Sequence, residues 1–242
     1  MKIDVRFTPG EPPEAAVAIV IDVLRATTTI AHALAQGYPR VLACAGLDHA
    51  RDLAGRLGDG TVLAGERECV RPDGFDLGNS PREFAAGEPL GQTLVLTTTN
   101  GTRAVVAAAA RADTVLIGSI ANLTACAAAA ARLARQTKGV VLVQCAGVAG
   151  EFALDDAYTA GRFVSELRVW LAEWEATDAA QAAEAIAAAF PSAAEGLGAS
   201  RSARNLRAAD LADDVRYCAR ESVLDVVPAV DDVHDDVALI IP

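Results

Sequence analysis

The 242-residue sequence lacks the features that most readily assign a chain to a class. Its five cysteines are widely scattered and form no CxxC pair, which argues against a zinc site and predicts a reducing compartment. No apolar run is long enough to cross a membrane, and the first residues lack the apolar core of a signal peptide. We therefore predict a cytoplasmic protein that has no membrane partner.

Positive charge is also scarce: 21 Lys and Arg residues stand against 32 Asp and Glu residues, which gives a formal net charge of -11 at pH 7. Such a chain lacks the broad electrostatic footprint that nucleic acids require, so we predict no nucleic-acid partner. Any bound anion must be held by a local cluster of arginines and helix ends. There is no long linker rich in Pro, Gly or Ser, so residues 1–242 are predicted to form a single domain.

Apolar stretches typical of strands alternate with helical patterns over most of the chain. The strand-like runs are too continuous for a sheet with one exposed face, which indicates a parallel sheet covered on both sides. We predict the α/β class: a three-layer α/β/α arrangement with a mainly parallel (mixed) sheet and a helix-rich C-terminal third, about 153–220, that begins with a long helix over "DDAYTAGRFVSELRVWLAEWEA". Two strands, "SVLDVV" and "VALIIP", should close the chain, with "DDVHDD" as a solvated turn between them. The other expected strands are 2–7, 17–22, 40–45, 61–65, 93–98, 114–118 and 139–144, and the expected helices lie near 26–36, 47–57, 101–111 and 121–136.

Polar and glycine-rich segments follow these strands, at the sheet edge where ligands of open α/β sheets bind. Arg25, Arg67 and Arg103 lie in such segments, and each can form paired hydrogen bonds to a phosphate, carboxylate or sulfonate. The threonines of 27–29 and 97–99 would add donors near helix starts. Threonine also commonly caps helices, but two triplets, each close to an arginine after a strand, favour anion binding.

Six acidic residues lie on the same loops. A carboxylate beside an anion site needs a partner, and Mg²⁺ bridging to phosphate is the usual one. Because Mg²⁺ commonly takes one or two carboxylates, we expect about two or three of the six to contact it. The others would cap helices or pair with arginines. The six are Asp22, Glu66, Asp76, Glu151, Asp155 and Asp156.

Known phosphatase signatures do not match. The position two residues after Asp22 is Leu24 instead of the second aspartate of DxDxT, and there is no P-loop or GxSxG elbow. Cys126 and Arg132 have the spacing of C-x5-R but lie in an alanine helix, so the match is attributed to chance. Cys145, at a strand end, is interpreted as a buried apolar residue and not as a nucleophile.

The motifs "VIDVLRATTT", "AGER", "GFDLGNSP", "LTTTNGTRA" and "CAG…GEFALDD" occur in this order. In order and spacing they resemble the ComB family of 2-phosphosulfolactate phosphatases, known from coenzyme M biosynthesis, over nearly the whole chain. The resemblance implies a phosphoric monoester hydrolase that uses Mg²⁺ to hydrolyse a small anionic substrate, 2-phospho-3-sulfolactate. Near the C-terminus "SARNL" keeps Arg204 but has Ala203 where the family tends to have glycine.

The candidate site combines the loop residues with this resemblance. The arginines would stabilise charge on the transferring phosphoryl group, and Glu151 or Asp155 would be the base for an attacking water. Attack by Asp22 itself is the competing mechanism. The predicted catalytic residues are Asp22, Arg25, Arg103 and Glu151; the predicted metal ligands are Asp22, Glu66, Asp76 and Asp155; and the predicted substrate-binding residues are Thr27, Thr28, Arg67, Asn79, Ser80, Thr98, Thr99, Asn100, Gly101, Thr102 and Arg204.

Two other functions stay open: a phosphatase of the same family acting on another small anionic phosphometabolite, and a non-catalytic anion or nucleotide-binding module. The loop acids favour an enzyme, because a bare anion binder would need only the arginines. The apolar helices after residue 153 would either cover the sheet or form the face of a homodimer.

Overall fold

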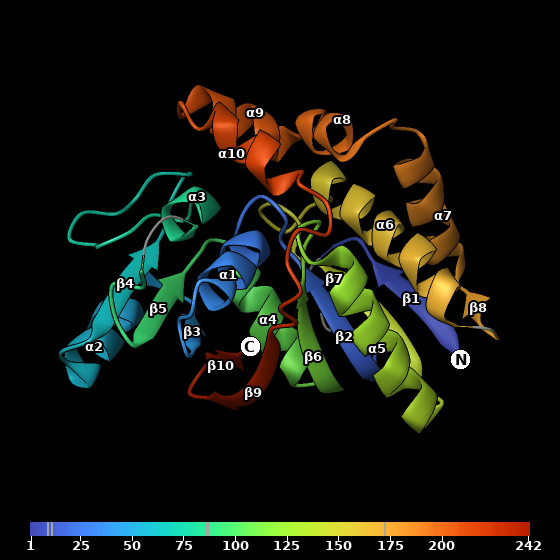
Figure 1. Cartoon of the computed structure of the whole chain (residues 1–242), viewed down its shortest axis with the longest axis horizontal. Helices are drawn as coiled ribbons and strands as arrows, with labels where there is room; N and C mark the ends of the chain where they lie inside the picture. Colours follow the sequence, from blue (N-terminus) through green and yellow to red (C-terminus); the bar gives the residue numbers. More distant parts are fainter. Residues whose placement is uncertain (9, 11, 86–87, 172) are drawn as a thin grey trace.

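The computed structural model describes the chain except for residues 9, 11, 86–87 and 172. Within that part, ten strands form one sheet and ten helices surround it (Figure 1). The strands are β1 (Lys2–Arg6), β2 (Ala15–Ile21), β3 (Val41–Cys44), β4 (Thr61–Gly65), β5 (Thr93–Thr97), β6 (Ala112–Gly118), β7 (Val140–Cys145), β8 (Glu175–Ala176), β9 (Ala229–His234) and β10 (Val237–Ile241). The helices are α1 (Ala26–Ala35), α2 (Leu47–Leu57), α3 (Pro81–Phe84), α4 (Gly101–Ala109), α5 (Leu123–Thr137), α6 (Leu154–Trp170), α7 (Asp178–Ala188), α8 (Ala193–Gly198), α9 (Arg201–Ala208) and α10 (Ala212–Cys218).

The sheet consists of two parallel groups joined by an antiparallel hairpin. Its order is β4-β5-β3-β10-β9-β6-β2-β7-β1-β8. The strands β4, β5 and β3 run parallel to one another, as do β6, β2, β7, β1 and β8, while β10 is antiparallel to β3 and β9. The carboxyl ends of both groups lie beneath the C-terminal helices α8 to α10 (Figure 1). Residues that follow β2, β4 and β5 are therefore brought together.

Strand β2 shows why both faces of the sheet are buried. Its side chains alternate: Val17, Ile19 and Ile21 join the core that contains residues of α5 and α6, whereas Ala18 and Val20 join the core that contains residues of α1 and α4. All five are fully buried. A continuous apolar strand therefore satisfies two helical layers at once. The predicted mainly parallel α/β fold is confirmed.

The end of the chain differs from the sequence prediction in two places. The "SVLDVV" segment forms no strand, and most of "DDVHDD" belongs to β9 instead of a turn. Only Asp235 and Asp236 make the turn, both with positive φ (49° and 59°), which is the backbone of a two-residue hairpin that aspartate tolerates. Helix α6 also ends earlier than expected, at Trp170, because Glu175–Ala176 pairs with β1 as the last strand of the sheet.

The helix starts divide into two kinds. Helices α7, α8 and α9 begin at Thr177, Ser192 and Ser200, whose hydroxyls accept main-chain N–H groups in the usual capping arrangement. Helices α1 and α4 begin at Arg25 and Asn100, and neither of these side chains caps its helix. The starts of α1 and α4 lie at the carboxyl edge of the sheet, where the partial positive charge of a helix favours an anionic group.

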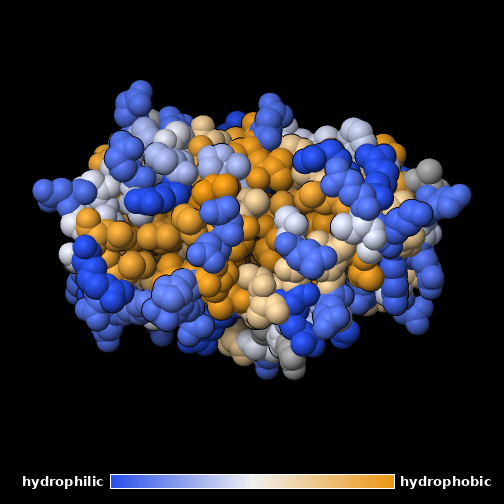
Figure 2. Space-filling model, turned by 90° about the horizontal axis from the view of Figure 1, so that it is seen from below, coloured by the Kyte–Doolittle hydropathy of each residue, from blue (hydrophilic) through white to orange (hydrophobic). Residues whose placement is uncertain are grey.

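The surface of the molecule gives few indications of function. Figure 2 shows an apolar area across the middle of the lower face, away from the C-terminal helices. Of the helices in the described part of the chain, none combines the length and apolar character needed to span a membrane.

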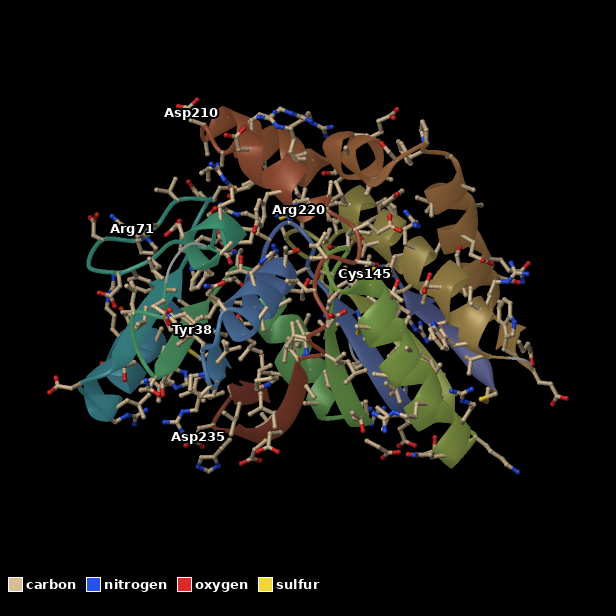
Figure 3. All side chains as sticks on the ribbon, viewed as in Figure 1. Tyr38, Arg71, Cys145, Asp210, Arg220 and Asp235 are labelled. Carbon is tan, nitrogen blue, oxygen red and sulfur yellow. The ribbon has the colours of Figure 1, made fainter. Side chains whose placement is uncertain are left out.

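Cys145 lies in the interior at the end of β7 (Figure 3), where burial raises the pKa of its thiol well above the usual value, as expected for a residue that serves packing.

Candidate active site

A cavity of about 470 Å³ opens where the carboxyl ends of β2, β4 and β5 meet under α9. It contains five charged side chains, three of them acidic, and we refer to it as the acidic cavity. A hollow of about 530 Å³ at the opposite edge of the sheet, between Ala15 and Val140, has four alanines among its ten lining residues and one arginine, Arg111. The acidic cavity is lined by Asp22, Leu24, Arg25, Glu66, Arg67, Glu68, Cys69, Asn79, Thr99, Asn100, Val148, Ser202, Asn205 and Leu206.

Asp22 follows the last residue of β2 and is buried between the starts of α1 and α4. Its Oδ1 accepts the main-chain N–H of Ala26 at 3.4 Å, and the N–H of Gly101 also stabilises the carboxylate. The two helices approach closely here: a Cβ on Gly101 would lie 2.6 Å from the Cβ of Ala26 and 2.7 Å from Asp22 Oδ2. Only glycine fits at position 101, so the "NGT" sequence brings the start of α4 against the carboxylate.

The pKa of Asp22 is raised to about 7, first because the group is buried and second because of the negative charges of Glu66 and Asp155. The N–H groups of Ala26 and Gly101 oppose the shift without cancelling it. Burial also raises the pKa of Asp155 to about 6 and that of Asp156 well above its ordinary value. Negative charge is therefore in excess around Asp22, and the ionised carboxylate would be stabilised by an added cation.

We expect the excess of negative charge around Asp22 to make the stability of the protein depend on pH. The folded-state pKa of Asp22 lies above the unfolded value near 4, so the folded protein retains a proton that the unfolded chain has lost. Asp22 then contributes to stability at low pH, and this contribution is lost as the pH rises through about 7. Thermal unfolding is measured in EDTA at about pH 5.5 and at about pH 8. Between these two pH values the melting temperature of wild type should fall more than that of Asp22→Asn. An equal fall in melting temperature in the two proteins would contradict the raised pKa of Asp22.

Arg25 is held by a residue from the far end of the chain. Its Nη1 lies 2.6 Å from Oδ2 of Asp214 on α10, and its Nη2 donates to the carbonyl of Cys69 at 2.9 Å. The side chains of Arg25 and Asp214 are 3% and 0% exposed, so this is a buried ion pair. The second oxygen of Asp214 accepts the hydroxyl of Ser80 at 2.7 Å. The pair fixes the guanidinium in the cavity wall and neutralises its charge.

Glu66 and Arg67 are positioned by a tight turn over Arg67–Val70. Glu68 and Cys69, at its centre, both have positive φ (51° and 70°), which is strained for residues other than glycine or asparagine. The turn directs the N–H of Cys69 at Oε2 of Glu66 (3.0 Å) and the carbonyl of Cys69 at Arg25. Oε1 of Glu66 accepts the N–H and the hydroxyl of Thr99 at 2.8 and 2.9 Å. The carboxylate is thus oriented from two sides.

Asn79 contributes an unpaired polar group. Asn79 lines the cavity, it is 4% exposed, and its Oδ1 has no hydrogen-bond partner among the described residues. Its carbonyl accepts the hydroxyl of Thr29, which ties the "GNSP" segment to α1. Buried polar groups are normally paired, so the unsatisfied oxygen marks Asn79 as an unusual member of the lining.

Several predicted substrate-binding residues act inside the fold instead of lining the acidic cavity. The hydroxyls of Thr27 and Thr28 donate to the carbonyls of Asp22 and Val23, which closes the turn from β2 into α1. The Oγ1 of Thr98 accepts the N–H of Thr102 at the start of α4. These interactions are those of ordinary helix starts. Of the predicted substrate-binding residues, Thr27, Thr28, Ser80, Thr98, Gly101, Thr102 and Arg204 are all outside the lining, and Arg67, Asn79, Thr99 and Asn100 belong to it.

Three predicted acids are likewise engaged elsewhere. Asp76 accepts the N–H of Leu63 at 2.8 Å, Glu151 forms an exposed ion pair with Arg201, and Asp155 accepts the hydroxyl of Ser202. Asp155 is buried close enough to Asp22 to raise its pKa, but it is not part of the cavity wall. Of the predicted metal ligands, the lining therefore contains Asp22 and Glu66.

The two remaining arginines do not line the acidic cavity. Arg204 is exposed and donates to the carbonyl of Ala199, because α9 turns Ser202, Asn205 and Leu206 toward the cavity and position 204 lies on another face. Arg103 lines a neighbouring cavity, described below.

Sequence reasoning did not identify Asp214, Cys69 or the cavity residues of α9. Asp214 lies 189 residues from Arg25 and looks in the sequence like an ordinary acid in the first turn of a helix. Cys69 stands next to the arginine motif but outside any pattern. The "SARNL" segment was noted, and a helical spacing of three and four residues from Ser202 would have singled out Asn205 and Leu206 in place of Arg204.

Comparison with known proteins gives a consistent result. Residues 6–233 match the 2-phosphosulpholactate phosphatase family. A probable 2-phosphosulfolactate phosphatase of Thermus thermophilus is 41% identical over 234 residues, which cover 95% of this chain and 94% of that protein. Proteins with the same description are 34% identical over 229 residues in Thermotoga maritima (94% and 95% covered) and 37% identical over 214 residues in Deinococcus radiodurans (88% and 87% covered).

These matches extend over the strands and helices that build the acidic cavity, and they make the protein a phosphoric monoester hydrolase. The chain belongs to the 2-phosphosulpholactate phosphatase family, as the resemblance of its motifs predicted.

Proposed function

We propose that the protein hydrolyses the phosphate ester of 2-phospho-3-sulfolactate to 3-sulfolactate and phosphate, as in coenzyme M biosynthesis, with Mg²⁺ as cofactor. The observation that carries the proposal is the convergence of Asp22, Glu66, Arg25 and Arg67 on one cavity in a chain of this family. The relatives named above are described as probable phosphatases of this substrate. A substrate with several anionic groups needs positive charge, which Arg25, Arg67 and a bound Mg²⁺ would supply in this cavity.

The side chains of the acidic cavity fit a hard cation. Asp22 and Glu66 both line it, and the charge of Glu66 is one cause of the raised pKa of Asp22. Mg²⁺ prefers oxygen ligands, commonly takes one or two carboxylates and completes its shell with water and phosphate oxygens. In the described part of the chain, no three His, Cys, Asp or Glu side chains are grouped so as to hold a metal ion, so protein carboxylates would supply only part of that shell.

The roles of the chain's own residues follow from their contacts. Asp22 and Glu66 would hold Mg²⁺, which when bound supplies positive charge to the phosphate oxygens. Arg25, fixed by Asp214, would donate to the transferring phosphoryl group, and Arg67, which also lines the cavity, would be a second donor. The buried starts of α1 and α4 add partial positive charge at the same place. Positioning and electrostatic stabilisation account for most catalysis of phosphoryl transfer.

Phosphate release from a substrate panel tests the proposal. The panel contains phosphosulfolactate, phospholactate and phosphoglycerate, each with Mg²⁺ and with EDTA. We expect release from phosphosulfolactate, lost in EDTA and restored by excess Mg²⁺. Release from phosphosulfolactate that persists in EDTA would overturn the metal requirement. Release from a non-sulfonated ester alone would favour another small anionic phosphometabolite, and no release at all would favour a binding module.

A further inference from the structure

A second cavity of about 420 Å³ adjoins the acidic cavity and shares Thr99 and Asn100 with it. It lies between the start of α4 and the segments that follow β1 and β7. Arg103 stands at its wall, together with the buried side chain of Gln144 and the alanines Ala104, Ala107, Ala146 and Ala149. We refer to it as the arginine cavity.

The two cavities differ in charge. The acidic cavity has three carboxylates against Arg25 and Arg67, and Arg25 is neutralised by Asp214. In the arginine cavity, Arg103 is the one charged side chain among the lining residues that the structure describes. Within the part of the chain that the structure describes, no residue forms a hydrogen bond or an ion pair with its guanidinium. The first cavity therefore needs an added cation before it can take an anion, whereas the second offers a positive charge that none of its described lining residues neutralises.

The substrate of the proposed function has two chemically different ends. The phosphate carries up to two negative charges and is the group that a metal ion stabilises best. The sulfonate carries one diffuse charge over three oxygens and matches a guanidinium, which presents several donors in a plane and is weakly hydrated. The groups sit on adjacent carbons, so a substrate beside the shared residues Thr99 and Asn100 can direct one end into each cavity.

We propose that the arginine cavity is the subsite for the sulfonate end of the substrate and that Arg103 determines specificity for it. This inference rests on the proposed function and assigns Arg103 to the group that is not transferred. Apolar alanines around a single guanidinium suit a weakly hydrated monoanion, and Gln144 is already occupied by the carbonyls of Thr8 and Cys145. Arg103 is therefore the group in this cavity that distinguishes a sulfonated ester from a plain one.

Substrate selectivity of Arg103→Gln tests the assignment. A lost charged hydrogen bond corresponds to roughly a 10- to 100-fold decrease, which we expect in kcat/KM for phosphosulfolactate. With phospholactate, which lacks the sulfonate, the change should stay within about threefold, and Arg103→Lys should recover part of the selectivity. Arg132→Gln, on the exposed face of α5, is the matched control for losing a surface arginine. The phosphate ester of 2-hydroxyethanesulfonate, which lacks the carboxylate, should behave like phosphosulfolactate.

Each contrary outcome has a distinct meaning. Equal losses on both esters would overturn the proposal and place Arg103 at the transferred phosphate. The proposal would also be overturned if the decrease in kcat/KM of Arg103→Gln occurred with the esters that carry the carboxylate and not with the ester that carries only the sulfonate. If wild type released no phosphate from any ester, the proposed function would fail, and calorimetric binding of 3-sulfolactate and lactate would still decide the subsite. Binding of 3-sulfolactate that weakens in Arg103→Gln, with lactate unaffected, supports it; binding that is indifferent to Arg103 overturns it.

Discussion

Replacing Asp22 with asparagine is expected to lower kcat by about 10³-fold, equivalent to roughly 4 kcal/mol of activation free energy. Asparagine keeps an oxygen that can accept the N–H of Ala26 but removes the negative charge that would hold Mg²⁺ opposite Glu66. Stability should change in the other direction. Because burial and neighbouring acids raise the pKa of Asp22 to about 7, its ionised form is unfavourable in the fold, and Asp22→Asn should unfold at a higher temperature at about pH 8 in EDTA.

This opposite pair of effects distinguishes a functional carboxylate from a structural one. A residue needed only to close the turn into α1 would lose stability and activity together. The matched control is Asp76→Asn: Asp76 accepts the N–H of Leu63 and lies outside the acidic cavity. Its activity should stay within about threefold of wild type, since surface substitutions usually change little. A control that lost activity as completely as Asp22→Asn would count against the site as described.

The competing mechanism, attack by Asp22 on phosphorus, is separated by acid-quenched single turnovers. If Asp22 holds the cation, the peptide that contains it should carry no phosphoryl group at any time during turnover. A phosphorylated peptide in wild type, absent from Asp22→Asn, would assign the nucleophile to Asp22. Measured Mg²⁺ affinity gives a second readout, because loss of a metal ligand weakens binding and loss of a nucleophile does not.

Asp214→Asn is expected to lower the free energy of unfolding by about 3 to 5 kcal/mol, because it leaves the buried charge of Arg25 without its partner. It should also lower kcat/KM by roughly 100-fold, since Arg25 would no longer be fixed in the cavity wall. Urea unfolding measures the first effect and initial rates measure the second. In the double variant Arg25→Met with Asp214→Asn, stability should partly recover while activity does not.

The neighbouring residue provides the control. Asp213 is half-exposed and contacts Arg216 and Arg82 at the surface, so Asp213→Asn should change stability by less than about 1 kcal/mol. If Asp213→Asn and Asp214→Asn were equally destabilising, α10 would be sensitive to any change of charge, and the ion pair would lose its special role. A double variant that recovered activity would show that Arg25 is dispensable.

Much of the fold was accessible from the sequence because it depends on local patterns. Continuous apolar runs such as residues 17–21 can be buried only between two layers, which indicates a mainly parallel sheet. The closing hairpin was less accessible, since β9 contains the first two acids of "DDVHDD" and a polar run gives no strand periodicity. Its strand character comes from pairing with β10, which is a long-range effect.

The chemistry that gathers at the sheet edge can be read from local sequence, because Asp22, Arg25, Glu66, Arg67 and Thr99 all follow strand ends. In the folded chain these five residues line one cavity. The tertiary structure decided how these groups are used. It brought Asp214 to Arg25 across 189 residues, committed the hydroxyls of Thr27 and Thr28 to helix starts, and placed Arg103 in a separate cavity. The physical reason is that residue type and strand-end position are local properties. The charge that surrounds a side chain, and so its pKa and its role, depends on segments that meet only when the chain has folded.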